Sequence, residues 1–210
     1  MEHSSEIVEK NTEISETDEA GKADPKSVRK GRRKPYSRSG LLTLVRDVLI
    51  ALLVIVLILQ VVRPTVIFEH SMEDTLMPRD YVFLFQLAYK FEDIQHGDIV
   101  VCESTLLDER GVPKNLIKRV IGLPGDKIEI KNDAVYRNDE RLIEPYTKDG
   151  YTYGEMDAII VPPNSYFLLG DNRQVSKDSR NAAIGCVLES KVKGKVFFRL
   201  FPISHMGRVG

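Results

Sequence analysis

The sequence has few of the side chains that build disulfide frameworks or metal sites. Its 210 residues include two cysteines, Cys102 and Cys186, and four histidines. Two cysteines this far apart do not form a disulfide framework, and they lack the short paired spacing of a zinc site. We therefore expect both to be buried apolar residues and expect no metal ion or organic cofactor, while the sequence leaves a disulfide between them open.

The motifs of several enzyme classes are also missing. There is no phosphate-binding glycine loop, no dinucleotide-binding fingerprint and no HExxH motif. One histidine, His70, adjoins a serine, Ser71, but neighbouring side chains on a strand point to opposite faces and pair poorly. A Ser-His-Asp triad therefore has little support.

Charge is distributed in blocks, although the formal net charge is only −1. Residues 1–20 hold seven acidic residues and one lysine, whereas residues 22–38 hold eight lysines and arginines and one aspartate. Such blocks lack the apolar residues that would offset the entropy of ordering. We predict that residues 1–40 form a disordered tail, whose acidic half could be a solvated segment without a specific role.

The longest apolar run covers residues 41–62 and reads LLTLVRDVLIALLVIVLILQVV. As a helix it would span about 33 Å, enough to cross a bilayer core of about 30 Å. A soluble core helix needs a polar face, and Val48–Leu59 has none. A cleaved signal peptide is also disfavoured, because 40 residues precede the run and no small-x-small site follows it. The run is predicted to be a single transmembrane anchor.

The basic residues beside this run predict its direction. Residues 26–40 hold seven lysines and arginines, whereas residues 63–82 hold only Arg63 and Arg79. Because the more basic flank stays inside, the tail is expected to be cytoplasmic and residues 63–210 to lie outside the cytoplasm. The basic segment can also attract anionic lipid of the bilayer.

Residues 63–210 have the pattern of a compact, mostly β domain. Short runs rich in Val, Ile, Phe and Tyr alternate with clusters of Gly, Pro, Asn and Asp. Residues 87–91 could form a short helix. The predicted strands are Thr65–Phe68, Tyr81–Phe85, Asp98–Cys102, Leu116–Gly122, Lys127–Ile130, Ala134–Arg137, Tyr166–Leu169 and Lys195–Phe201.

A lysine can replace histidine as the base that activates a serine nucleophile. That chemistry requires a neutral lysine, and burial can lower the pKa from about 10.4 by up to about 3–5 units. Lys118 lies in an apolar run and, on a strand, would share a face with Leu116 and Val120 while Arg119 points the other way. It is either such a base or a strand lysine that extends to solvent.

Two further segments could complete a serine hydrolase site. Ser71 follows the first predicted strand, where a turn could expose its hydroxyl and let its backbone N–H bind an oxyanion, although a loop serine alone is ordinary. Residues 170–180, GDNRQVSKDSR, follow an apolar strand. A turn with an internal ion pair explains them, or Ser176 and Asp178 orient the base.

Together these residues resemble the type I signal peptidase (bacterial leader peptidase) family of Ser/Lys membrane serine proteases. The resemblance runs from the anchor almost to the C-terminus and leaves out the first 40 residues. Its four ordered blocks are Ser71-Met72 with Thr75-Leu76, then Gly97–Val101, then Lys118–Asp126, and finally Gly170–Arg180, which matches GDNRxxSxDSR fully.

The resemblance implies a role for each matching residue. Ser71 would be the nucleophile and Lys118 the general base, Ser176 would hydrogen-bond to the lysine, and Asp178 and Arg180 would form an ion pair. The remaining motif positions of the predicted site are Met72, Gly170, Asp171 and Asn172. The implied fold is a β-rich catalytic core with a small β insertion.

The resemblance also implies a substrate and a setting. The substrate would be a preprotein, cleaved after a signal peptide with small residues at positions −1 and −3. Such a peptide would bind extended along a strand edge, with small pockets that exclude bulk. The enzyme would act at the cell membrane beside the secretion translocon and would bind no nucleic acid.

The block around Ser71 departs from the family pattern at two positions. The family usually has Pro where this chain has Asp74, and Gly or Ser where it has Glu69. A carboxylate cannot donate a hydrogen bond to an oxyanion and would repel it. Either Glu69 points away, or the oxyanion hole relies on backbone N–H groups, or activity is reduced; we favour backbone donation.

Two other readings remain. A catalytically impaired, membrane-anchored relative could act as a binding or scaffold protein, and Glu69 and Asp74 are its only support. A self-cleaving regulator of the related Ser/Lys repressor type is cytoplasmic and carries a DNA-binding domain. This chain has a predicted anchor and no such domain, which disfavours that reading.

Overall fold

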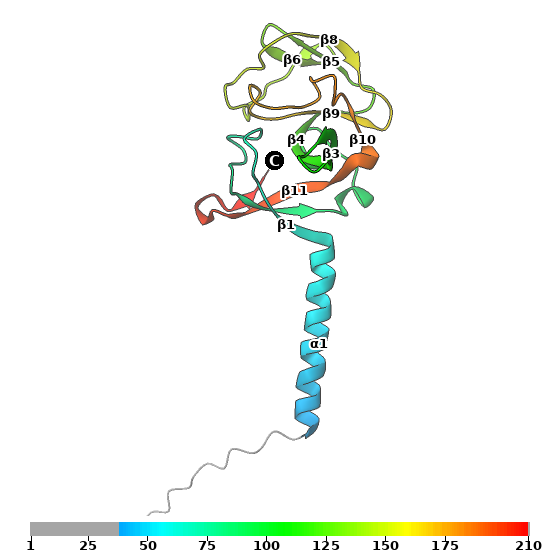
Figure 1. The fold of residues 1–210 in the computed structure, drawn as a ribbon, viewed down its shortest axis with the longest axis vertical. Coiled ribbons are helices and arrows are strands. Elements are labelled where there is room, and N and C mark those ends of the chain that lie inside the picture. The colour runs from blue at the N-terminus through cyan, green and yellow to red at the C-terminus, as the bar shows by residue number, and fades with distance from the viewer. Residues whose placement is uncertain (1–37, 210) are drawn as a thin grey trace, which may run out of the picture. The chain divides into compact units, whose positions relative to one another are not determined.

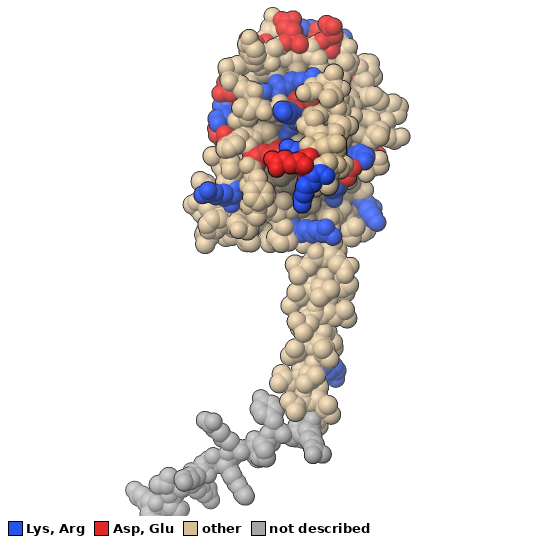
Figure 2. All heavy atoms as spheres, viewed as in Figure 1, with Lys and Arg blue, Asp and Glu red and all other residues tan. Residues whose placement is uncertain are grey.

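The computed structural model describes residues 38–209, so most of the predicted tail lies outside the described residues. Helix α1 covers Arg38–Val61 and begins three residues before the predicted anchor. Its side chains from Leu41 to Gln60 are all exposed, and Figure 2 shows this helix as a surface almost without charged side chains. Within residues 38–209 it is the one helix long and apolar enough to cross a membrane.

The rest of the described chain is mostly β, as expected from the sequence (Figure 1). Three short 3₁₀ turns cover Ala88–Lys90, Glu189–Lys191 and Ile203–His205. The strands are β1 (Val62–Val66), β2 (Tyr81–Phe85), β3 (Ile99–Leu107), β4 (Pro113–Gly122), β5 (Lys127–Lys131), β6 (Ala134–Arg137), β7 (Glu140–Arg141), β8 (Met156–Ile160), β9 (Ser165–Leu169), β10 (Val187–Leu188), β11 (Val192–Phe201) and β12 (Gly207–Arg208).

These strands form two sheets. The larger sheet has eight strands in the order β1-β2-β11-β3-β4-β9-β10, with β12 paired to β11. The smaller sheet has four strands in the order β7-β6-β5-β8, and the chain enters it after β4 and leaves it before β9. Because β4 and β9 are neighbours in the larger sheet, the smaller sheet is the predicted β insertion; it lies beyond β9 in Figure 1.

Two of the predicted strands, Tyr81–Phe85 and Ala134–Arg137, match the structure residue for residue. The predicted strand Thr65–Phe68 is wrong in its bounds, because β1 starts at Val62, directly after the helix, and ends at Val66. The chain leaves the sheet there and enters the loop that carries Ser71. The short helix expected at residues 87–91 is a single 3₁₀ turn.

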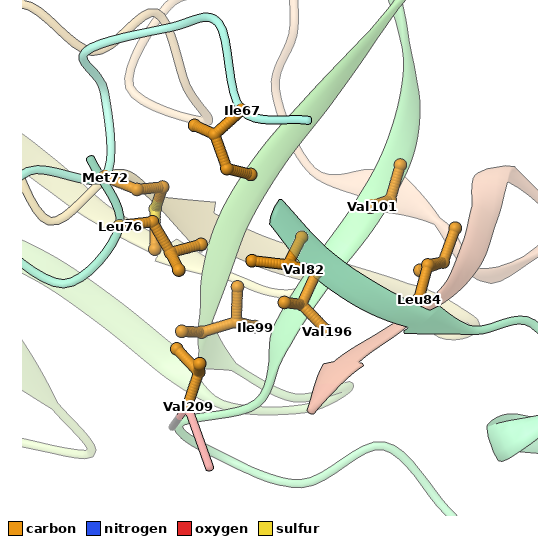
Figure 3. Packing of buried hydrophobic residues seen from close by; sticks show 9 residues of the cluster. All are labelled: Ile67, Met72, Leu76, Val82, Leu84, Ile99, Val101, Val196 and Val209. Atoms are coloured by element: carbon orange, nitrogen blue, oxygen red, sulfur yellow. The ribbon is translucent and has the colours of Figure 1, made fainter. Parts of the chain in front are cut away.

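Three buried apolar clusters hold the domain together. The first lies between β2, β3, β11 and the Ser71 loop, which we define as residues 67–80. Figure 3 shows Met72 and Leu76 of this loop pointing into the cluster with Val82 and Ile99. The second cluster lies around β3, β4 and β9, and the third joins β4 and β9 to the smaller sheet. Burial of Ile67 before Ser71, and of Met72 and Leu76 after it, therefore fixes the loop against the core on both sides of the serine.

The cysteines are free thiols in this structure. Cys102 is buried in the second cluster, as expected, and burial raises its pKa to about 11. Cys186 is only half-buried and packs against the third cluster.

Candidate active site

Ser71 and Lys118 meet in the interior of the domain. The Nζ of Lys118 lies 2.8 Å from the Oγ of Ser71, which comes from a loop 47 residues earlier in the chain. The same amine donates a second hydrogen bond to the carbonyl of Ile117 at 2.9 Å. A serine hydroxyl and a lysine amine at this distance can exchange a proton directly.

The position of Lys118 follows from its strand. β4 lies between β3 and β9, and from Lys118 to Gly122 its residues are buried on both faces. Leu116 and Val120 flank Lys118 on the same face and belong to the second cluster. The lysine side chain is consequently only 1% exposed, and Ser71 is 7% exposed.

This burial changes the acid–base behaviour of Lys118. Removal of the charged amine from water lowers the pKa of Lys118 below its ordinary value, and this is the largest effect. The negative charges of Glu69 and Asp178 act in the opposite direction and raise that pKa. The net direction is downward, which increases the fraction of neutral amine that can accept a proton.

A backbone hydrogen bond from Asn172 connects the segment of residues 170–180 to the Ser71 loop. The backbone N–H of Asn172 donates to the Ser71 carbonyl at 3.0 Å. Gly170 approaches the same carbonyl so closely that a Cβ at this position would lie 2.4 Å from it. A side chain at position 170 would therefore displace the serine, which explains the glycine in this motif.

The predicted ion pair between Asp178 and Arg180 is present. The guanidinium Nε and Nη2 of Arg180 donate to the two Asp178 oxygens at 2.8 and 2.9 Å. One of these oxygens also accepts the backbone N–H of Gly170 at 3.1 Å. The pair thus fixes the turn that brings residue 170 to Ser71.

The hydrogen bond expected between Ser176 and Lys118 is not formed. The Ser176 Oγ is buried and has no hydrogen-bond partner among the described residues. It lies close to Gly170, since a Cβ on that glycine would meet the Oγ at 2.3 Å. Lys118 instead uses the Ile117 carbonyl as its second partner.

A buried ion pair beside the lysine was missed by the sequence reasoning. Arg119 donates from Nε and Nη2 to the two carboxylate oxygens of Asp171 at 2.9 and 2.7 Å, with side chains only 5% and 0% exposed. Thr75 of the Ser71 loop donates to the same carboxylate at 2.5 Å. An arginine inside an apolar strand was the available signal, because such a charge needs a buried partner.

A cleft opens beside Ser71. It has a volume of about 470 Å³ and its lining includes residues of β1 and the Ser71 loop, together with Val101 and Ile117. Glu69 lines this cleft and is exposed, whereas Asp74 is exposed without lining it. The backbone N–H of Ser71 has no hydrogen-bond partner within residues 38–209, so it is available to an acceptor in the cleft.

This arrangement is suited to acyl transfer. A serine hydroxyl, an adjacent amine of lowered pKa and an unpaired backbone donor lie together, and Ser71 lines an open cleft. An extended segment that pairs with the edge strand β1 would pass Ser71, because β1 leads directly into the Ser71 loop.

Known proteins are similar in sequence to this chain over most of its length. The family model for signal peptidase, peptidase S26, matches residues 41–201. A signal peptidase I of Bacillus amyloliquefaciens is 33% identical over 185 residues, which cover 83% of this chain and 96% of that protein. A signal peptidase IB of Staphylococcus aureus is 35% identical over 162 residues, covering 69% of this chain and 81% of that protein.

A solved structure of a signal peptidase I from Enterococcus faecalis is 30% identical, with a TM-score of 0.41 over 50% of this chain and 97% of that chain. The family match extends from the apolar helix through the strand that ends at Phe201. The chain therefore belongs to the signal peptidase family, peptidase S26.

Proposed function

We propose that this chain is a type I signal peptidase, a membrane-anchored serine endopeptidase that removes signal peptides from exported preproteins. Ser71 is the nucleophile and Lys118 the general base. The observation that carries the proposal is the 2.8 Å hydrogen bond between these two side chains inside an apolar environment. The family match gives the reaction class.

The reaction begins with a proton transfer. Neutral Lys118 accepts the hydroxyl proton of Ser71 while the Oγ attacks the scissile carbonyl carbon. The carbonyl oxygen becomes an oxyanion, which the backbone N–H of Ser71 stabilises. Lys118 then gives its proton to the departing amine, the C–N bond breaks, and an ester forms between Ser71 and the signal peptide.

The same two groups complete the turnover. Lys118, neutral again, accepts a proton from a water molecule that attacks the ester carbonyl. The second tetrahedral intermediate collapses, the Ser71 oxygen leaves with the proton held by Lys118, and the free signal peptide departs. The net reaction is hydrolysis of one peptide bond by one water molecule, and Ser71 and Lys118 return to their starting protonation states.

The proposed setting follows from the chain's anchor. Residues 41–62 cross the cell membrane once, the basic residues before them remain cytoplasmic, and residues 63–210 lie outside the cytoplasm. The substrate is an exported preprotein with small residues at −1 and −3, bound extended in the cleft beside β1. The enzyme acts beside the translocon that delivers this substrate.

Cleavage of a preprotein in detergent tests the proposal. Wild-type enzyme should cut after a small-x-small site, and Ser71→Ala should show no turnover above background, with the cut position determined by mass spectrometry. A correctly folded wild type that cuts none of several preproteins would sink the proposal and favour a scaffold role for this fold.

Replacement of Glu69 by glutamine should make the enzyme active at lower pH. The Glu69 carboxylate raises the pKa of Lys118, so its removal lowers that pKa and leaves more neutral amine on the acidic side. The acidic limb of the kcat/KM profile should move to lower pH, while Asp157→Asn on β8 should leave it in place. An unmoved limb would show that this carboxylate does not influence the base.

Glu69→Gly separately tests whether the carboxylate obstructs the oxyanion. Because the backbone N–H of Ser71 is unpaired and can donate to the oxyanion, we expect kcat on the plateau of the pH profile to change less than about tenfold. A larger gain would mean that the Glu69 carboxylate repels the developing oxyanion.

A further inference from the structure

Glu73 lies two residues after Ser71, and its buried carboxylate has three hydrogen-bonding partners from three segments. The Nδ1 of His70, in the Ser71 loop itself, lies 2.5 Å from Oε1. Lys148 donates from Nζ to Oε2 at 2.6 Å, and the amide of Asn172 donates to the same oxygen at 3.3 Å. The Glu73 side chain is only 10% exposed.

Lys148 reaches this carboxylate from the smaller-sheet insertion, in the segment between β7 and β8. Its backbone N–H donates to the carbonyl of Asp171 at 3.1 Å, so the segment that carries it is fixed to residues 170–180. The hydrogen bond to Glu73 raises the pKa of Lys148, and the same contact is the largest cause that lowers the pKa of Glu73. Both groups are therefore charged at neutral pH.

The Ser71 loop is thus held at three points around the nucleophile. The Ser71 carbonyl accepts from the Asn172 N–H, Thr75 donates to the Asp171 carboxylate, and Glu73 between them binds Lys148. The first two contacts involve residues 171–172, which follow β9. Among the hydrogen bonds and ion pairs of residues 38–209, Glu73–Lys148 is the one that connects the loop to a side chain of the insertion.

We propose that Glu73 and Lys148 are positioning residues: their ion pair, the Glu73–Lys148 brace, holds Ser71 in line with Lys118 and makes the smaller-sheet insertion a part of the active-site framework. This inference rests on the proposed peptidase function. An ion pair whose lysine is 37% exposed to solvent contributes only modestly to stability, but a displacement of about 1 Å at a reacting atom can cost about 100-fold in rate. The brace should therefore affect kcat far more than folding.

Lys148→Met removes the charge and keeps most of the side-chain length. We expect kcat for preprotein cleavage to fall about tenfold and KM to change less than about twofold, because the substrate cleft is untouched. Lys148→Arg, which can still pair with Glu73, should recover most of the rate. The control is Lys127→Met: Lys127 also belongs to the insertion, is 38% exposed against 37% for Lys148, and pairs at 2.6 Å with an exposed carboxylate, that of Asp139.

A double-mutant cycle separates positioning from general damage. Glu73→Gln should lower kcat as Lys148→Met does, and the combined variant should be no slower than the worse single variant. The acidic limb of the pH profile should stay in place, because the carboxylates that most strongly affect the pKa of Lys118 are Glu69, Asp178 and Asp171. Equal activity of Lys148→Met and Lys127→Met, or a loss that merely follows a lowered Tm, would overturn the brace.

Hydrogen exchange measures the effect of the Glu73–Lys148 brace on the Ser71 loop independently of peptidase activity. Backbone amides of residues 70–76 should exchange faster in Lys148→Met than in wild type or Lys127→Met. If wild type cleaves no preprotein but this exchange difference is present, the proposed function fails and the brace stands. If wild type cleaves preprotein and exchange is unchanged, the brace fails and the proposed function stands.

Discussion

Replacing Lys118 with methionine should abolish preprotein cleavage and, at acidic pH, should raise the free energy of unfolding of the domain. General-base catalysis contributes about 10²–10⁴ in rate, and methionine has no group that accepts the Ser71 proton. Methionine has a similar length and fits an apolar site that is now occupied by a side chain with 1% exposure. Activity and stability should therefore change in opposite directions.

The pH dependence gives this prediction its sign. Because burial lowers the pKa of folded Lys118, the unfolded chain binds this proton more tightly than the folded chain. The wild-type free energy of unfolding therefore rises with pH between the folded-state pKa of this lysine and the ordinary value of 10.5, and the destabilisation by Lys118 is fully present below that window. Lys118→Met removes this dependence.

Urea unfolding at several pH values measures the effect. The stability of Lys118→Met relative to wild type should be highest at acidic pH and should decrease as pH rises toward 10. The cleavage assay on the same preparations supplies the rate. A variant that still turns over preprotein, or a stability difference that is constant with pH, would contradict a buried lysine base.

Replacing Asp171 with asparagine should destabilise the domain by about 3–5 kcal/mol, because it leaves the Arg119 guanidinium buried without a counter-charge. The pair is almost fully excluded from solvent, and Arg119 also donates to the Gly97 carbonyl at 2.9 Å and lies 4.0 Å from the centre of the Tyr146 ring. These contacts hold the guanidinium in place and prevent it from turning toward water. The urea midpoint should fall accordingly.

A second variant tests the cause. Arg119→Met combined with Asp171→Asn removes both charges, and its urea midpoint should lie closer to wild type than that of Asp171→Asn alone. The exposed carboxylate of Asp139 gives the comparison, since Asp139→Asn should leave the midpoint nearly unchanged. If the losses of the two substitutions at positions 119 and 171 simply add, the unpaired buried charge is not the reason.

Hydrophobic pattern was sufficient to predict the buried strands but not the exposed ones. β9 is buried at every position and its run of apolar residues is plain in the sequence. β8 is a missed strand, because most of its side chains face solvent and it lies at the edge of the smaller sheet. β7, β10 and β12 have two residues each, too few to show a period of two.

Individual residues of the candidate site could be predicted from the sequence, but the hydrogen bonds and ion pairs between distant segments could not. An apolar run around Lys118 signals a buried amine, whereas Ser71 is ordinary without its family resemblance. Nothing local in the sequence indicates that Glu73 pairs with Lys148, 75 residues later. Such contacts depend on how the strands order themselves in two sheets, and sequence periodicity carries no information about that order.

The contacts that build the site also determine when during folding it can exist. Ser71 and Lys118 are 47 residues apart, Arg119 and Asp171 are 52 apart, and Thr75 and Asp171 are 96 apart. Contacts of such high sequence separation form slowly, because chain entropy must be lost before they stabilise anything. A newly synthesised chain therefore has no serine–lysine pair held in register until the segment after β9 has docked, and the rate of folding sets the delay before its first cleavage.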